Sequence, residues 1–304
     1  VMPIYLPFFS CHFSHFITGS HAMASTAPYR LNDIGRFQGS GPPFRKVSWS
    51  LDEHFVAGIG NNIVETWDFK TRQRVLLQKK RTNPVDIQFT CNNSRVVYCA
   101  DATTVVAYDI AVERVSSSLT FGGSGITSIA CSPVNEYLFV IGKVNGDVIM
   151  RDTREREAIV TEGKRIAGGS VDCLKYSSDG AYLTAVVSGS GNHRSIFVYD
   201  LGLPGSNPMS QLDGRNLIRC SSAIATGATN VAFSPRNSQL AIGNNEGVAV
   251  LWDFNVNQYS VLSGQQTRQK PVNGIGYSGD HLFVSDDGKI FAWDTQKKIL
   301  LGSM

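Results

Sequence analysis

Residues Cys131–Asp152, CSPVNEYLFVIGKVNGDVIMRD, contain most of a repeating structural unit. A polar turn at 132–135 is followed by the apolar run Tyr137–Ile141, by a turn of Asn, Gly and Asp, and by a second apolar run that ends in Arg151-Asp152. Short apolar runs between turn-forming residues are typical of antiparallel β-strands joined in hairpins. The stretch therefore predicts two strands of a small antiparallel sheet.

The pair of residues that closes this stretch recurs along the chain. Each copy is a large residue followed by Asp at the end of an apolar run. The copies are Trp67-Asp68, Tyr108-Asp109, Arg151-Asp152, Tyr199-Asp200, Trp252-Asp253 and Trp293-Asp294. Successive Asp residues lie 41, 43, 48, 53 and 41 positions apart. A period of about 40 to 45 residues is typical of a repeated four-stranded sheet, and the two longer spacings indicate insertions.

Each repeat also begins with a strand in which apolar residues occupy alternate positions. These strands are Val47–Ser50, Ile87–Thr90, Ile129–Ser132, Leu174–Ser177, Val231–Ser234 and Ile275–Ser278. Alternation of this kind predicts a strand with one buried face. With the polar turn, the second apolar run and the closing pair, the pattern repeats six times.

Over residues 44–302 this pattern resembles the WD-repeat (WD40) family. The resemblance implies an all-β fold, a WD40-type β-propeller with six recognisable blades and room for an irregular seventh. In such a fold each blade packs on the next, and closure of the ring protects the sheet edges. The blade at 131–152 is also similar to a blade of the centrosomal WD-repeat proteins that recruit γ-tubulin complexes.

The sequence departs from the family in two respects. WD repeats usually carry a Gly-His pair before the first strand, and none of the histidines, at 12, 15, 21, 54, 193 and 281, occupies that position. Residues 27–38 predict an extra outer strand, although Lys297–Leu301 already predicts one for the last blade. Either the ring has six blades and one redundant strand, or a seventh blade is irregular or completed by a partner.

We expect residues 27–304 to form a single propeller domain. Residues 1–26 are left out of the fold as a leader, a cloning scar or an upstream extension, and we expect them to be disordered. Two insertions rich in Gly, Ser, Pro and Asn predict exposed loops in the fourth blade. One, 188–195, lies between its second and third strands, and the other, 201–214, follows its third strand.

The composition narrows the function classes. With 42% hydrophobic and 17% charged residues the chain is an ordinary globular one, and a net charge of +3 does not demand a nucleic-acid partner. The six cysteines show no C-x-x-C spacing, so we expect buried thiols in a reducing compartment, the cytoplasm or the nucleus. No apolar run reaches the roughly 18 to 20 residues that span a bilayer, so we expect no membrane association.

No sequence motif indicates catalysis. The chain lacks G-x-x-x-x-G-K-[ST], G-x-S-x-G and H-E-x-x-H. The glycine-rich stretch 122–125, GGSG, connects two predicted strands instead of opening a helix, which favours a loop over a phosphate cradle. His54 and His193 fall on a strand start and in an insertion, where a structural or solvated role is expected. We therefore expect no enzyme activity, no cofactor and no metal site.

The connections that lead into the first strand of a blade carry a different signal, because most of them are basic. In a propeller these connections share one rim, where clustered cations would attract acidic or phosphorylated segments. The candidate partner-binding residues are Arg45, Lys46, Lys80, Arg81, Lys164, Arg165, Arg268 and Lys270. The connection at 119–125 has no charged residue. Charged side chains also collect in any exposed loop, so an ordinary solvated surface is the alternative.

The sequence thus predicts a non-catalytic scaffold that docks protein partners as a subunit of a larger complex, with a cytoskeletal or centrosomal setting suggested by the blade at 131–152. The alternative is binding of RNA or another polyanion through the basic rim. Aromatic residues suited to base stacking are not evident in the basic connections, so RNA ranks second.

Overall fold

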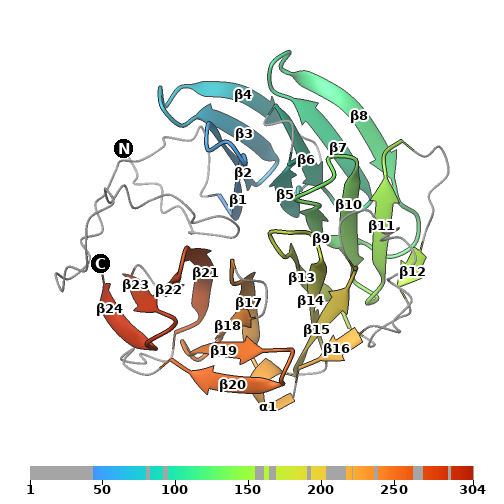
Figure 1. Cartoon of the computed structure of the whole chain (residues 1–304). Helices are drawn as coiled ribbons and strands as arrows, with labels where there is room; N and C mark the ends of the chain where they lie inside the picture. Colours follow the sequence, from blue (N-terminus) through green and yellow to red (C-terminus); the bar gives the residue numbers. More distant parts are fainter. Residues whose placement is uncertain are drawn as a thin grey trace. The chain divides into compact units, whose positions relative to one another are not determined.

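The structure of the 304-residue chain is a computed structural model (Figure 1). It describes residues 44–79, 83–91, 95–154, 161–163, 169–189, 193–202, 217–220, 222–235, 239–262, 270–286 and 289–303. The chain divides into two compact units. Of the described residues, those from 44 to 226 belong to the first unit and those from 227 to 303 to the second.

The first unit contains four antiparallel sheets, and each sheet is a meander of four strands that follow one another in the chain. Sheet 1 consists of β1 (Lys46–Trp49), β2 (Phe55–Gly60), β3 (Ile63–Asp68) and β4 (Arg74–Lys79), and sheet 2 of β5 (Asp86–Phe89), β6 (Val96–Ala100), β7 (Thr104–Asp109) and β8 (Arg114–Thr120). Sheet 3 consists of β9 (Ile126–Cys131), β10 (Leu138–Lys143), β11 (Val148–Asp152) and β12 (Thr161–Gly163), and sheet 4 of β13 (Val171–Tyr176), β14 (Tyr182–Ser188), β15 (Arg194–Asp200) and β16 (Leu217–Arg219). The short helix α1 (Ser222–Ala225) follows, which the sequence pattern did not predict.

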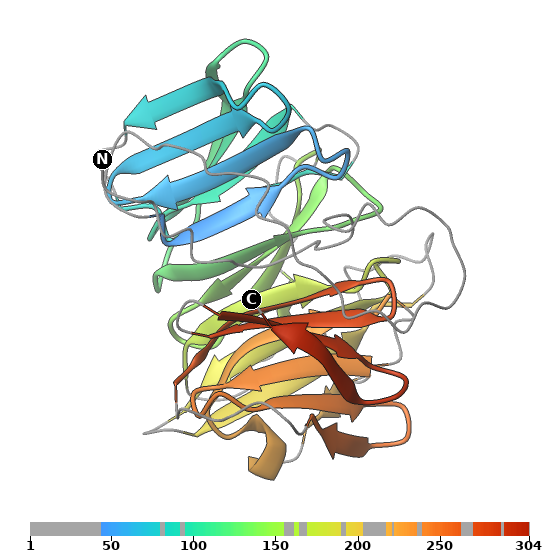
Figure 2. The same cartoon turned by 90° about the vertical axis from the view of Figure 1, so that its left-hand side faces the viewer.

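The second unit contains two sheets of the same kind. Sheet 5 consists of β17 (Ala228–Phe233), β18 (Gln239–Asn244), β19 (Ala249–Asp253) and β20 (Gln258–Val261), and sheet 6 of β21 (Val272–Ser278), β22 (His281–Asp286), β23 (Lys289–Asp294) and β24 (Ile299–Ser303). Figure 2 shows such a meander in sheet 1, where the four strands lie side by side. The all-β prediction and the six four-stranded repeats are confirmed.

Consecutive sheets stack through their first strands and bury a core between them. In the first unit β5 lies against β1, β9 against β5, and β13 against β9. Strand β10 is apolar at every position along Leu138–Ile141 because both of its faces are buried. Phe139 and Ile141 pack against sheet 2, whereas Leu138 and Val140 pack against sheet 4. Since neighbouring side chains of a strand point to opposite faces, a sheet between two others is buried on both.

In sheets 2, 4 and 6 the large residue of the closing pair faces the preceding sheet. Tyr108 belongs to the core shared with sheet 1, Tyr199 to the core shared with sheet 3, and Trp293 to the core shared with sheet 5. This repetition follows from the common strand register, because each of these residues pairs with an equivalent position of the neighbouring second strand.

Trp67 and Trp252 occupy the same register positions in sheets 1 and 5, and both are at most 2% exposed. Trp67 packs edge-on against Phe44 with ring centroids 5.0 Å apart, on the face of sheet 1 that turns away from sheet 2. Trp252 contacts Phe254, and its Nε1 donates a hydrogen bond to Asn257 Oδ1 at 3.1 Å. All three tryptophans of the closing pairs are buried, and Trp293 lies between two sheets.

The Asp of each closing pair holds the turn that follows. Its Oδ1 accepts hydrogen bonds from the backbone N–H groups two or three residues later, in all six sheets. The acceptors are Asp68, Asp109, Asp152, Asp200, Asp253 and Asp294. Asp side chains favour such turns because they satisfy backbone donors locally. The Asp residues recur for the turn that joins the third strand to the fourth.

Some boundaries differ from the prediction. The last strand, β24, begins at Ile299 because Lys297 and Lys298 belong to the turn, in which Lys298 has a φ of 57°. The predicted strand over Lys297–Leu301 was therefore placed two residues too early. Both insertions lie at the predicted junctions, after β14 and after β15. Residues 1–26 and 27–38 lie outside the described residues, so the extra strand and the seventh blade stay predictions, as do ring closure and the single domain.

Candidate docking surface

The first strands of sheets 1 to 4 begin at one edge of the first unit, which we call the connection edge. It contains residues 44–46, 83–86, 121–126 and 169–172, together with the turns at 101–103 and 144–147. Backbone hydrogen bonds tie these segments to one another, for example Ile126 N to Ala102 O at 2.8 Å and Val144 N to Gly125 O at 2.9 Å. This is the edge where the sequence predicts basic connections.

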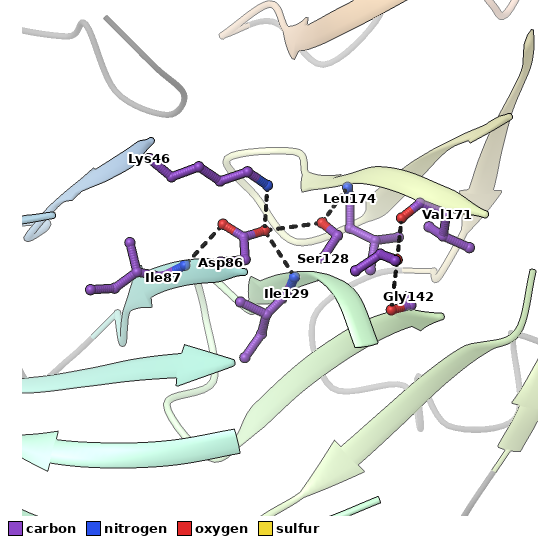
Figure 3. Close-up of polar contacts among 9 residues, drawn as sticks. Lys46, Asp86, Ile87, Ser128, Ile129, Gly142, Val171 and Leu174 are labelled. Atoms are coloured by element: carbon purple, nitrogen blue, oxygen red, sulfur yellow. Dashed lines mark hydrogen bonds and ion pairs between the residues drawn. The ribbon is translucent and has the colours of Figure 1, made fainter. Parts of the chain in front are cut away.

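Asp86, the first residue of β5, is the centre of a polar network at this edge (Figure 3). Lys46 Nζ lies 3.1 Å from its Oδ2, and Ser128 Oγ donates to the same oxygen at 3.1 Å. The backbone N–H of Ile87 donates to Oδ1 at 2.9 Å, and that of Ile129 donates to Oδ2 at 3.0 Å. Asp86 is 4% exposed. A carboxylate can be buried in this way because a cation and three further donors replace its water.

The network repeats one strand position across three sheets. Lys46, Asp86 and Ser128 each stand immediately before the first alternating apolar residue of their strand. This series of contacts extends to sheet 4, since Ser128 Oγ accepts a hydrogen bond from Leu174 N at 3.1 Å. Each first strand is thus bonded to the next by a side chain as well as by apolar packing.

A second connection between sheets joins the neighbouring strand position. Thr127 Oγ1 donates to Val171 O at 2.6 Å and lies 3.1 Å from Gly142 O (Figure 3). A side chain at Gly142 would place its Cβ 2.4 Å from Val171 Cγ1. Glycine is therefore required here, because the first strand of sheet 4 packs directly on the backbone of β10.

The second unit uses the same arrangement between sheets 5 and 6. Thr229 Oγ1 donates to Val272 O at 2.7 Å and lies 3.1 Å from Gly243 O. A Cβ on Gly243 would lie 2.4 Å from Val272 Cγ1. The Thr, Gly and Val thus recur at equivalent positions in the contact between sheets 3 and 4 and in that between sheets 5 and 6.

Arg45 occupies in sheet 1 the position that Thr127 occupies in sheet 3. Its Nη2 donates to Pro84 O at 2.8 Å and to the side-chain oxygen of Asn83. Pro84 O is in turn the equivalent of Val171 O. Arg45 therefore connects sheet 1 to sheet 2 and still reaches solvent, because the residue is exposed.

The structure brings two of the eight predicted partner-binding residues together, Arg45 and Lys46. The charge of Lys46 is matched by Asp86, so this residue contributes to the fold whether or not a partner also contacts it. Lys270 is exposed in the second unit. The remaining candidates, Lys80, Arg81, Lys164, Arg165 and Arg268, lie outside the described residues. A common rim for all eight stays a prediction.

One cation at this edge was not predicted from the sequence pattern. Lys143, the last residue of β10, extends its side chain to the loop at 122–125, where Nζ donates to Gly122 O. The connection at 119–125 contains no charge of its own, but the structure supplies one from a neighbouring hairpin. A lysine at the end of an otherwise apolar strand was the available signal, although the sequence does not reveal where its side chain lies.

Titration shifts among the described residues follow from burial and turn geometry. Burial raises the pKa of Tyr98 to about 12 and raises the pKa values of Tyr176, Tyr199 and Tyr277 as well. The pKa of Asp152 is lowered, mainly by the Arg154 guanidinium that donates to its carboxylate. These groups lie in cores or turns and do not form a nucleophile with an adjacent base.

The part of the chain that the structure describes contains no group of three or more His, Cys, Asp or Glu side chains placed to hold a metal ion. It also contains no helix that is long and apolar enough to cross a membrane. Cys99, Cys173 and Cys220 are buried, as the sequence indicates, and Cys91 and Cys131 are half-buried.

Comparison with models of protein families finds no match for this chain, and comparison with curated proteins finds none either. The resemblance to the WD-repeat family thus has the repeat pattern of the sequence as its basis.

Proposed function

We propose that this chain is a WD-repeat β-propeller that acts as a non-catalytic scaffold and docks protein partners, by acidic or phosphorylated segments, within a larger assembly. Six consecutive four-stranded meanders support the propeller, because this fold repeats such a sheet as its blade. Stacking of the sheets through their first strands supports it further.

The docking proposal is carried by one observation, that backbone oxygens fix cationic side chains at the connection edge. Arg45 is held by the backbone of sheet 2 and remains exposed, and Lys143 is held by the loop at 122–125. Cations fixed on a rigid stack of sheets bind an acidic segment at little entropic cost, because their side chains are already ordered. Further basic residues of the predicted rim, such as Arg81 and Arg165, would add to the same field.

The test compares two double variants of the whole chain. The variant Arg81→Glu with Arg165→Glu reverses two charges of the predicted rim. The control, Lys70→Glu with Arg114→Glu, reverses two exposed charges in sheets 1 and 2 that lie at or beside the turns between the third and fourth strands, away from the connection edge. The control variant should fold, because exposed substitutions usually change stability by less than about 0.5 kcal/mol, and circular dichroism verifies the fold of both variants. Affinity purification with mass spectrometry should show partners of the wild type lost from the first variant and kept by the second. Equal recovery by both would overturn the proposal for this edge.

RNA binding is the second candidate function, and the same basic residues favour it. The two aromatic side chains that the structure describes at the connection edge, Phe44 and Phe121, are buried and cannot stack on bases. Any RNA contact would then be made mainly through phosphates and should weaken steeply with salt. Absence of binding to single- and double-stranded RNA at about 50 mM salt, where phosphate contacts are strong, would exclude this candidate.

A further inference from the structure

Lys143 is an unusual residue for its place in the repeat. It stands at the end of the second strand of its sheet, and the equivalent positions in sheets 2 and 5 are Asp101 and Asn244. Those side chains accept hydrogen bonds from their own turns, for example Asp101 Oδ1 from Thr104 N at 2.8 Å and Asn244 Oδ1 from Val248 N at 2.8 Å. A lysine has no acceptor and cannot do this, so the hairpin does not explain its presence.

Within the described chain, the buried ammonium group of Lys143 has no anionic partner. The residue is 4% exposed, and its Nζ donates to Gly122 O at 2.5 Å. Among the described residues, no carboxylate lies within ion-pairing distance of this nitrogen. Buried charges in proteins are normally paired with an opposite charge, since a neutral carbonyl offsets only part of the lost hydration.

The loop beside Lys143 offers further donors. Residues 122–125 form no helix or strand, and Gly123 has a φ of 80°, a conformation that glycine adopts without strain. Within the described chain, the four backbone N–H groups of this loop donate to no hydrogen bond. The Oγ of Ser124 is buried and has no hydrogen-bond partner among the described residues. Successive free N–H groups in a glycine-rich turn form a concave site for an anion.

Space is available for a ligand at the outer part of the loop. A Cβ added to Gly122 would meet no atom within 4 Å, and one added to Gly123 would lie 3.6 Å from Lys143 Nζ. Two turns of the connection edge carry carboxylates, and each accepts a hydrogen bond within its own turn, Asp101 Oδ1 from Thr103 N at 3.0 Å and Asp147 Oδ2 from Asn145 Nδ2 at 2.6 Å.

We propose that the loop 122–125 and Lys143 form a binding site for a phosphate monoester, the phosphoryl group of a phosphoserine or phosphothreonine in a protein partner. A phosphate group accepts several hydrogen bonds, and its negative charge would pair with the buried ammonium group of Lys143. The backbone N–H groups, the Ser124 hydroxyl and the Lys143 ammonium supply donors of the required kind. The donors of this site are what favours a phosphate group. That the phosphate belongs to a protein partner rests on the docking function proposed above.

Titration of the isotope-labelled whole chain with inorganic phosphate, monitored by NMR of backbone amides, tests the site. The amide signals of residues 122–125 should shift in a saturable way, and O-phosphoserine should reproduce the shifts whereas serine should not. Lys143→Met, which keeps the apolar stem, should weaken binding by about tenfold or more, because one charge-assisted contact is lost. Lys298→Met removes an exposed lysine of the second unit and should leave binding unchanged.

Ser124→Ala is the second variant, for the case that Lys143→Met does not fold, and it should weaken phosphate binding without changing the fold. The site is refuted if phosphate shifts other signals only, or if Lys143→Met and Ser124→Ala bind phosphate like the wild type. Phosphatase treatment of the lysate before affinity purification separates the two proposals. Partners retained after treatment support docking and contradict the phosphate site as its basis. Phosphate binding without any captured partner supports the site and contradicts docking.

Discussion

At the scale of single residues, the charged groups of the connection edge differ in what they do for the fold. Asp86 satisfies donors from sheets 1, 2 and 3, and it is buried because each of its oxygens is occupied. Arg45 contributes to one sheet contact and keeps part of its surface in solvent. Asp86 is therefore used fully by the fold, whereas Arg45 joins two sheets and also retains capacity for a partner.

Asp86→Ala should reduce the free energy of unfolding by about 3 to 5 kcal/mol, because it leaves the Lys46 ammonium and three further donors without their acceptor. Denaturation in urea, followed by circular dichroism, measures this change. Lys46→Met is the matched control and should cost less, since Asp86 keeps its three other donors. A loss below about 1 kcal/mol for Asp86→Ala, the net value of an ordinary hydrogen bond, would mean that the network does not join the sheets.

The buried tyrosines give a prediction for alkaline pH. Burial between sheets 2 and 3 raises the pKa of Tyr98 from 10.0 to about 12. The neutral phenol is thus favoured in the folded state, and its contribution is complete below pH 10 and is lost as the pH rises towards 12. The free energy of unfolding should decrease as the pH rises over this range, and it should decrease less steeply for the Tyr98→Phe variant than for the wild type. Urea unfolding at pH 8 to 11.5 measures this effect, and equal slopes for the two proteins would contradict it.

At the scale of elements, the first strands need close approach between sheets. Gly142 permits it at the contact between sheets 3 and 4, because Val171 packs on its backbone. Gly142→Ala should therefore destabilise the chain by about 1 to 3 kcal/mol, the usual cost of overpacking.

Val171→Ala alone should also destabilise, by loss of buried surface. The double variant should be more stable than the sum of the two single effects predicts, because the smaller side chain makes room for the new methyl group. Thermal unfolding of the four proteins completes the cycle. Strictly additive effects would show that the two residues do not constrain each other.

Elements were also what the sequence predicted best. Alternating apolar positions identify the first strand of each sheet, and the closing Asp residues mark the turns that they cap. The contact that the Lys143 side chain makes was not predictable, because its partner, the loop at 122–125, lies some twenty residues earlier in the chain. The roles of Arg45 and Lys46 were missed for a related reason. Their partners lie about 40 residues away, and sequence patterning reports local periodicity only.

At the scale of the whole molecule, the repeated contacts raise the question of how far cooperativity extends. The Thr–Gly–Val contact occurs in both units, and sheets within each unit share continuous cores. Repeat proteins with neighbour-only contacts can unfold in parts. A propeller closed into a ring, in contrast, has no end at which unfolding can begin without disrupting two interfaces.

Our last prediction is that the chain unfolds as one cooperative domain. Trp252→Ala, in the second unit, should lower stability by about 3 to 5 kcal/mol through the cavity that it leaves. If the ring is closed, the first unit should become less stable by the same amount. A fluorophore on a cysteine introduced at exposed Arg114 would report unfolding of sheet 2, and circular dichroism would report the whole chain. The two transitions should coincide in wild type and in Trp252→Ala, and both should move together. An unchanged transition at sheet 2 would show that the units unfold independently, and it would exclude the single closed propeller.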